Sequence, residues 1–167
     1  MNKTLAVLFV LAFPAFTILA QEPLVNYKDR TIAQIIDLNK TAVDAGFRNA
    51  KLQDETELVG GDPLYSKVTL QFLGSARPVS DGRKKLISSW GRLSKIDKKA
   101  TDLYVNEIKF AEGSKEYWLG IPNSLIPMIA GKIKKGESAS LYVSYTGAFK
   151  PKDQKDYESV LIITAVQ

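Results

Sequence analysis

Residues 65–76 carry a strand pattern broken by one glycine: Tyr65-Ser66-Lys67-Val68-Thr69-Leu70-Gln71-Phe72-Leu73-Gly74-Ser75-Ala76. Val68, Leu70 and Phe72 alternate with polar residues, which is typical of a half-buried β-strand. Gly74 then interrupts the alternation. Because a glycine inside a strand often marks a bulge or a sharp bend, we predict one long strand that serves two sides of a closed sheet.

Further strands are predicted on the C-terminal side of this segment. The Asp81-Gly82 pair is typical of a hairpin turn, so residues 85–93 around Trp90 are predicted as strand two. Residues 102–110 are predicted as strand three. Residues 116–121 fit either a continuation of strand three or a separate short strand, and the pattern leaves both open.

Two more strands complete the predicted sheet. Residues 138–145 alternate strictly, with an apolar face made of Ala139, Leu141, Val143 and Tyr145. Residues 160–166 are apolar on both faces, so this last strand should be covered on both sides.

Two segments have helical spacing. Residues 31–47 place Ile32, Ile35, Ile36, Asn39, Val43 and Phe47 near one helical face. Asp29 or Thr31 is expected to cap that helix, and Gly46 to end it. Residues 122–135 are predicted as the second helix, capped by Asn123 or Ser124 and stopped by Gly136.

From residue 65 onward, the order is a glycine-broken strand, two strands, a helix and two strands. This order resembles the five-stranded oligonucleotide/oligosaccharide-binding (OB) barrel, whose helix lies between strands three and four. The resemblance is to an architecture, and it implies a mainly β fold, a five-stranded barrel with a helix between strands three and four. The helix predicted over residues 31–47 is an extra element outside this pattern. The expected organisation is a signal peptide over 1–20, a helix and linker over 21–64, and the barrel over 65–167.

Proteins that this architecture resembles bind ligands across strands two and three and between the first and fourth loops. Carried over by position, the candidate ligand-binding residues are Arg83, Lys84, Trp90, Arg92, Tyr104, Lys109 and Lys150. Aromatic rings beside cations suit single nucleic-acid strands or sugars. The alternative, which we favour, is that Trp90 and Tyr104 fill the core and the lysines solubilise loops.

Residues 116–122, Glu-Tyr-Trp-Leu-Gly-Ile-Pro, have an unusual composition with two adjacent rings, Tyr117 and Trp118. On a strand only one of the two rings can point inward. The other is either covered by the N-terminal helix, which we favour, or available to a partner protein or a sugar.

The N-terminus has the pattern of a cleavable secretory signal. Lys3 supplies the positive region, residues 5–19 are mostly apolar, and Ala20 precedes polar chain, so cleavage is predicted after Ala20. An uncleaved anchor is the alternative, but the run is shorter than about 20 residues and contains Pro14. We therefore expect a location in the periplasm or outside the cell, without stable membrane insertion.

Composition restricts the chemistry, because the chain has no histidine and no cysteine. The usual general base, the thiolate nucleophile and the common ligands of zinc, copper and haem are all missing. No cofactor or metal site is predicted, and an enzyme is not expected. The alternative is a carboxylate-dependent hydrolase using Asp54, Glu55, Glu57 and Asp62, which we interpret instead as a solvated loop.

These observations predict an exported, non-enzymatic binding module for an anionic or sugar polymer. The alternative is a protein-interaction or scaffold component of a bacterial envelope assembly. The net charge of +5 is modest, and export disfavours nucleic acid as a partner. The sequence does not indicate an oligomeric state.

Overall fold

The computed structural model describes residues 26–49, 57–59, 63–151 and 154–167, so the predicted signal peptide lies outside the described residues. The strands are β1 (Lys28–Asp29), β2 (Glu57–Val59), β3 (Ser66–Pro78), β4 (Asn106–Glu112), β5 (Lys115–Ile121), β6 (Ser138–Phe149) and β7 (Glu158–Val166). The helices are α1 (Ile32–Asn49), α2 (Asp81–Leu93), α3 (Lys98–Thr101), the 3-10 turn η2 (Asn123–Leu125) and α4 (Ile126–Lys132).

The strands form one mixed sheet in the order β1-β3-β4-β5-β7-β6-β2, with an additional pairing between β3 and β6. The pairings β1–β3 and β5–β7 are parallel and the others are antiparallel. The fold is therefore mainly β with helices, as the sequence predicted at that level.

The predicted long strand with an interruption at Gly74 is confirmed as β3. Strand β3 pairs with β6 through Ser66–Gln71 and with β4 through Gln71–Pro78. The register shifts between Phe72 and Ala76, and Gly74 between them has a φ of +73°. A side chain at Gly74 would be strained, since the left-handed region favours glycine. The bend therefore lets one strand pair with two different neighbours.

The prediction of a strand over residues 85–93 is wrong, because this segment belongs to helix α2. The buried residues of α2 recur at helical spacing and are Arg83, Leu86, Ile87, Trp90 and Gly91. That spacing places them on one helical face toward the sheet, whereas the Asp81-Gly82 pair had suggested a hairpin. Residues 81 and 82 instead begin the helix.

The third predicted strand is shorter at its start than expected. Strand β4 begins at Asn106, and residues 98–101 form helix α3. The open question about residues 116–121 is answered by β5, a separate strand that pairs with β4 from Asn106↔Ile121 to Glu112↔Lys115. Gly113, with a φ of +60°, lies in the turn between the two strands.

Helix α1 begins with a reciprocal cap at Thr31, one of the two predicted caps. The Thr31 hydroxyl accepts from the Gln34 backbone N–H at 3.1 Å, and the Thr31 N–H donates to Gln34 Oε1 at 2.9 Å. The Glu112 carboxylate accepts from the Ile32 and Ala33 N–H groups at 2.8 and 3.2 Å. These bonds satisfy four N-terminal donors. The helix continues past Gly46, so the predicted stop there is wrong.

The second predicted helix forms over a shorter range. It consists of η2 and α4 and ends at Lys132, three residues before the predicted end. Pro122 occupies the cap position of η2, so Asn123 and Ser124 lie inside the turn rather than before it. Gly136, with a φ of +91°, lies beyond the helix and before β6.

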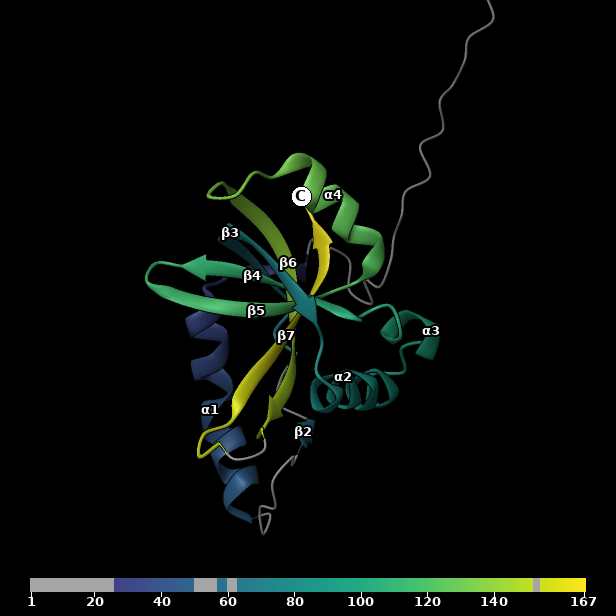
Figure 1. Ribbon diagram of the computed structural model, residues 1–167. Coiled ribbons are helices and arrows are strands. Elements are labelled where there is room, and N and C mark those ends of the chain that lie inside the picture. Colours follow the sequence, from purple (N-terminus) through teal and green to yellow (C-terminus); the bar gives the residue numbers. More distant parts are fainter. Residues whose placement is uncertain (1–25, 50–56, 60–62, 152–153) are drawn as a thin grey trace, which may run out of the picture.

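Two hydrophobic clusters pack on opposite faces of β7. Leu161 and Ile163 belong to the larger cluster, which also takes in residues of α1 and α4. Val160 and Ile162 belong to the smaller cluster beneath α2. The prediction that this strand is covered on both sides is thus confirmed. Figure 1 shows α1 and α2 on either side of the sheet and α4 near its upper end.

None of the helices in the described ranges combines the length and the apolar character needed to cross a membrane.

Candidate functional site

A groove opens where strands β5 and β7 separate. The two strands pair at a single position, Gly120↔Ile162, and Figure 1 shows them diverging from there. Two adjoining hollows of about 560 and 500 Å³ share Arg77, Arg83 and Glu158. We call them together the β5–β7 groove. It is lined by the end of β3, the start of α2, β5, the end of β6, the start of β7 and one residue of α1.

Ion pairs between different elements form the middle of the groove. Arg83 of α2 donates to the Glu107 carboxylate of β4 and, at 2.5 Å, to the Glu158 carboxylate of β7. Arg77 of β3 donates to the other oxygen of Glu107 at 2.8 Å. The Arg83 and Glu107 side chains are 7% and 1% exposed. Because buried charges are costly unless paired, this network fixes how four elements meet.

Trp118 provides an aromatic ring at the edge of this network. The ring is half-buried, and the Arg77 guanidinium carbon lies 4.1 Å from its centroid. Lys109, its cross-strand neighbour on β4, places Nζ 5.6 Å from the centroid and also pairs with Glu116. Both distances are in the range of cation–π contacts.

Tyr117 lies on the opposite face of β5 and packs partly buried against the larger core cluster. The expectation that only one ring points inward is therefore confirmed. Burial raises the pKa of the Tyr117 phenol, and the nearby Glu112 charge raises it further. Trp118 is the outward ring, and we expected helix α1 to cover it. The side chains that lie over this ring are instead Arg77 of β3 and Lys109 of β4.

Tyr157 holds the opposite wall of the groove against α1. Its ring stacks on Phe47 with 4.9 Å between centroids and 15° between planes. Its hydroxyl donates to the Asp44 carboxylate at 2.8 Å. Burial, followed by the hydrogen bond to Asp44, raises the pKa of Tyr157 to about 12. The phenol therefore stays neutral at physiological pH.

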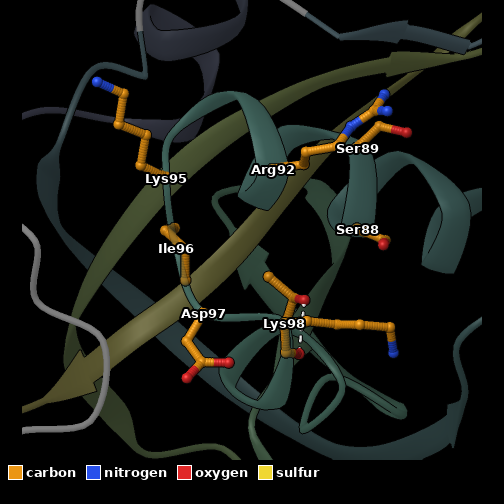
Figure 2. Close-up of a pocket in the computed structure, with 8 residues that line it drawn as sticks. Ser88, Ser89, Arg92, Lys95, Ile96, Asp97 and Lys98 are labelled. Atoms are coloured by element: carbon orange, nitrogen blue, oxygen red, sulfur yellow. Dashed lines mark hydrogen bonds between the residues drawn. The ribbon is translucent and has the colours of Figure 1, made fainter.

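A second hollow of about 790 Å³ lies between α2 and α3, and Figure 2 shows its lining. We call it the α2–α3 pocket. Its charged residues are Arg92, Lys95, Asp97 and Lys98. Figure 2 shows the ends of Arg92, Lys95 and Lys98 pointing in three different directions. Since recognition of one small anion needs donors that converge, this pocket is less organised than the β5–β7 groove.

Several sequence-predicted site residues have structural roles instead. Trp90 and Tyr104 are buried in the smaller core cluster, as the favoured alternative stated. The Tyr104 hydroxyl donates to the Ile163 carbonyl at 3.0 Å, and burial raises the pKa of this phenol strongly. Arg83 is buried in its ion pairs. The placement of Trp90 and Arg92 on a second strand is wrong, because both lie on α2.

The other predicted cations lie apart from one another. Lys84 is exposed, 3.6 Å from the Asp81 carboxylate. Arg92 is exposed at the α2–α3 pocket. Lys150 is half-buried just after β6. Of the predicted ligand-binding residues, the structure brings Lys109 next to Trp118.

The sequence reading missed Arg77, Glu107, Glu158 and Tyr157. Glu107 alternates with Ile108 and Phe110 but points to the other face of β4, where Arg83 of α2 covers it. Nothing in the sequence indicates that an outward carboxylate on a strand will be buried. Glu107 is buried by helix α2, most of which the sequence pattern wrongly predicts as a strand.

The acidic cluster lies mostly outside the described residues. Asp54, Glu55 and Asp62 fall in the undescribed segments, and the backbone of Glu57 pairs with Phe149 in strand β2. Over the part of the chain that the structure describes, histidine, cysteine, aspartate and glutamate do not gather in groups of three that could hold a metal ion.

Comparisons of the chain with protein-family models, with curated proteins and with solved structures find no match.

Proposed function

We propose that the chain is an exported, non-enzymatic binding module built on an OB-type barrel, with an extended ligand lying along the β5–β7 groove. The strand pairings run β3–β4–β5–β7–β6 and return to β3. Helix α4 lies between β5 and β6 in the chain. Five strands in this order, with a helix between the third and the fourth, are the pattern of the OB fold.

The position of the groove supports this role. OB proteins bind ligands at the second and third strands, between the first and fourth loops. Here those strands are β4 and β5, the first connection holds α2 and α3, and the fourth joins β6 to β7. The groove is lined by β5, the start of α2, Pro151 and Tyr157.

The observation that carries the proposal is the half-buried Trp118 ring with Arg77 over it. Arg77 covers one face of the ring, and a planar ring fixed in this way can stack a ligand ring on its other face at little entropic cost. The ion pairs around it leave each charged groove residue with a partner, which suits recognition better than proton transfer.

The test is the loss of polymer binding when the ring is removed. We expect Trp118→Ala to weaken binding of the polysaccharide that the mature protein retains best by about tenfold, an amount that corresponds to about 1.4 kcal/mol. Leu93→Ala is the matched control, because Leu93 is 66% exposed on α2 and does not line the groove. Equal binding by the two variants would contradict the proposal.

A second candidate function is protein interaction, and the separation of β5 from β7 favours it. Strand β5 meets β7 at one residue pair, so the edge over residues 115–119 has no paired strand among the described residues. Such an edge can accept an extended peptide by strand addition. The antiparallel register directs the backbone of residues 116 and 118 away from β4, so Glu116→Pro would remove one donor from this open edge. A captured envelope protein that binds this variant as well as wild type would contradict the idea.

A further inference from the structure

Resting on the proposed binding role, we infer that the ligand of the β5–β7 groove is an uncharged sugar polymer, and that polyanions are excluded from it. The first reason is charge balance. Arg77, Arg83 and Lys109 face the carboxylates of Glu107, Glu116 and Glu158, and each of the six belongs to an ion pair. Asp81, at the end of the groove, pairs with Lys84.

A polyanion gains affinity when cations neutralise its charges and release counterions. In this groove the cations already have carboxylate partners. To bind a sulfate or carboxylate group, Arg83 would have to leave Glu107, whose side chain is 1% exposed. Leaving one member of a buried pair without its partner costs more than an exposed contact returns.

The aromatic ring points to the same ligand class. The face of an indole ring carries partial negative charge, so it attracts cations and positively polarised C–H groups and repels anions. Arg77 occupies such a position at 4.1 Å from the Trp118 centroid. A pyranose ring with equatorial hydroxyls presents C–H groups on its faces, so it fits the same preference on the face of Trp118 that Arg77 does not cover.

The ion pairs also offer hydrogen bonds to a neutral ligand. Guanidinium and ammonium groups only donate, and carboxylates only accept. A sugar hydroxyl does both, so it can bond to either member of a pair without displacing the other. Glu116 is 54% exposed and Glu158 is 38% exposed, so both carboxylates remain accessible from solvent while paired.

Two cellulose derivatives with the same backbone separate charge from shape. Hydroxyethyl cellulose is neutral and carboxymethyl cellulose is anionic, and retardation of the mature protein in native gels that contain each polymer measures the two affinities. We expect retardation by the neutral polymer, with about a tenfold loss in Trp118→Ala and a partial recovery in Trp118→Phe. We expect little change between about 50 and 200 mM salt, since counterion release does not contribute.

The outcomes separate the ligand class from the binding role. Retardation by carboxymethyl cellulose alone, lost in Trp118→Ala, would overturn the class and leave the binding role standing. Equal retardation of wild type and Trp118→Ala would overturn both. If wild type binds neither polymer, the inferred class is wrong. Unfolding in urea checks that Trp118→Ala is folded.

A charge variant tests whether the pairing of cations with carboxylates determines which polymer binds. Glu116→Gln keeps the shape and the acceptor of the side chain but leaves Lys109 without its carboxylate partner. We expect the ratio of anionic to neutral polymer binding to rise severalfold and to become dependent on salt. An unchanged ratio would show that charge pairing does not control the choice of ligand.

Discussion

The β5–β7 groove and the α2–α3 pocket contain similar residue types but organise them differently. In the groove, Arg83 reaches carboxylates on β4 and β7 and is 7% exposed. In the pocket, Lys98 pairs with Asp102 one helical turn away at 2.6 Å, and both are more than half exposed. Cations that line a hollow are therefore not enough to identify a binding site. The groove differs from the pocket because its ion pairs connect segments that are distant in the sequence.

The way helix α2 ends accounts for the shape of the pocket. The Ile96 N–H donates to the Gly91 carbonyl at 2.8 Å, and the Lys95 N–H donates to the Arg92 carbonyl at 3.3 Å. With Lys95 at a φ of +58°, this is the Schellman arrangement. The turn sends Lys95 away from Arg92, as Figure 2 shows. The pocket thus follows from helix termination and needs no ligand to explain it.

The largest effect is expected from Glu107→Ala. The variant leaves Arg83 buried with one carboxylate fewer, and breaking a buried pair costs about 3 to 5 kcal/mol. Urea unfolding measures the loss. Lys98→Ala in the pocket removes an exposed pair and should cost less than about 1 kcal/mol. Similar losses in the two variants would contradict the difference drawn between the two regions.

Gly82→Ala is expected to have the next largest effect, because Gly82 lines the groove against Phe149. A Cβ at residue 82 would lie 2.3 Å from two carbons of the buried Phe149 ring. Overpacking of this kind costs about 1 to 3 kcal/mol. The control is Gly131→Ala in α4, where a Cβ meets nothing within 4 Å and should stabilise the helix by about 0.5 kcal/mol. Thermal unfolding that ranks the variants in the reverse order would contradict this packing.

Tyr104→Phe tests whether Tyr104 is a core residue. The variant removes the hydrogen bond to the Ile163 carbonyl and leaves that acceptor buried, so we expect a loss of about 1 kcal/mol. Polymer binding should not change, since Tyr104 lies beneath α2 and does not line the groove. A loss of binding at unchanged stability would restore Tyr104 as a ligand contact.

Patterns within one element predicted the sheet well. The alternation before Gly74 identified β3, and the apolar faces of residues 138–145 and 160–166 identified β6 and β7. Residues 85–93 were misassigned because a two-residue turn signal outweighed the helical spacing of Leu86, Ile87 and Trp90. In this segment tertiary packing outweighs the local turn propensity of the Asp-Gly pair.

The candidate site was less predictable from the sequence. Trp118 and Lys109 could be named because rings and cations stand out in composition. The network of Arg77, Glu107 and Glu158 could not, since its members are separated by 30 and 51 residues and each looks like an ordinary surface charge. In the folded chain Arg77 contacts Glu107, and both Glu107 and Glu158 contact Arg83. These contacts join the residues into one network.

The smallest effect is expected from Tyr157→Phe, which releases the groove wall from Asp44. Near neutral pH the loss should be about 0.5 kcal/mol. The folded protein holds the Tyr157 proton up to a pKa of about 12, whereas the unfolded chain releases it near the ordinary value of 10. Wild-type stability should therefore fall between about pH 10 and 12, and less steeply in the variant. Identical pH profiles would show that Tyr157 is not held by α1.

The most direct measurement is an NMR titration of the ¹⁵N-labelled protein with cellohexaose. The chain has two tryptophans, Trp90 and Trp118, and hence two indole N–H signals. We predict that the Trp118 indole signal and the backbone signals of Arg77 and Lys109 shift, while those of Trp90, Arg92 and Lys95 stay in place. Shifts confined to the α2–α3 pocket, or no shifts at all, would contradict a sugar-binding role for the β5–β7 groove.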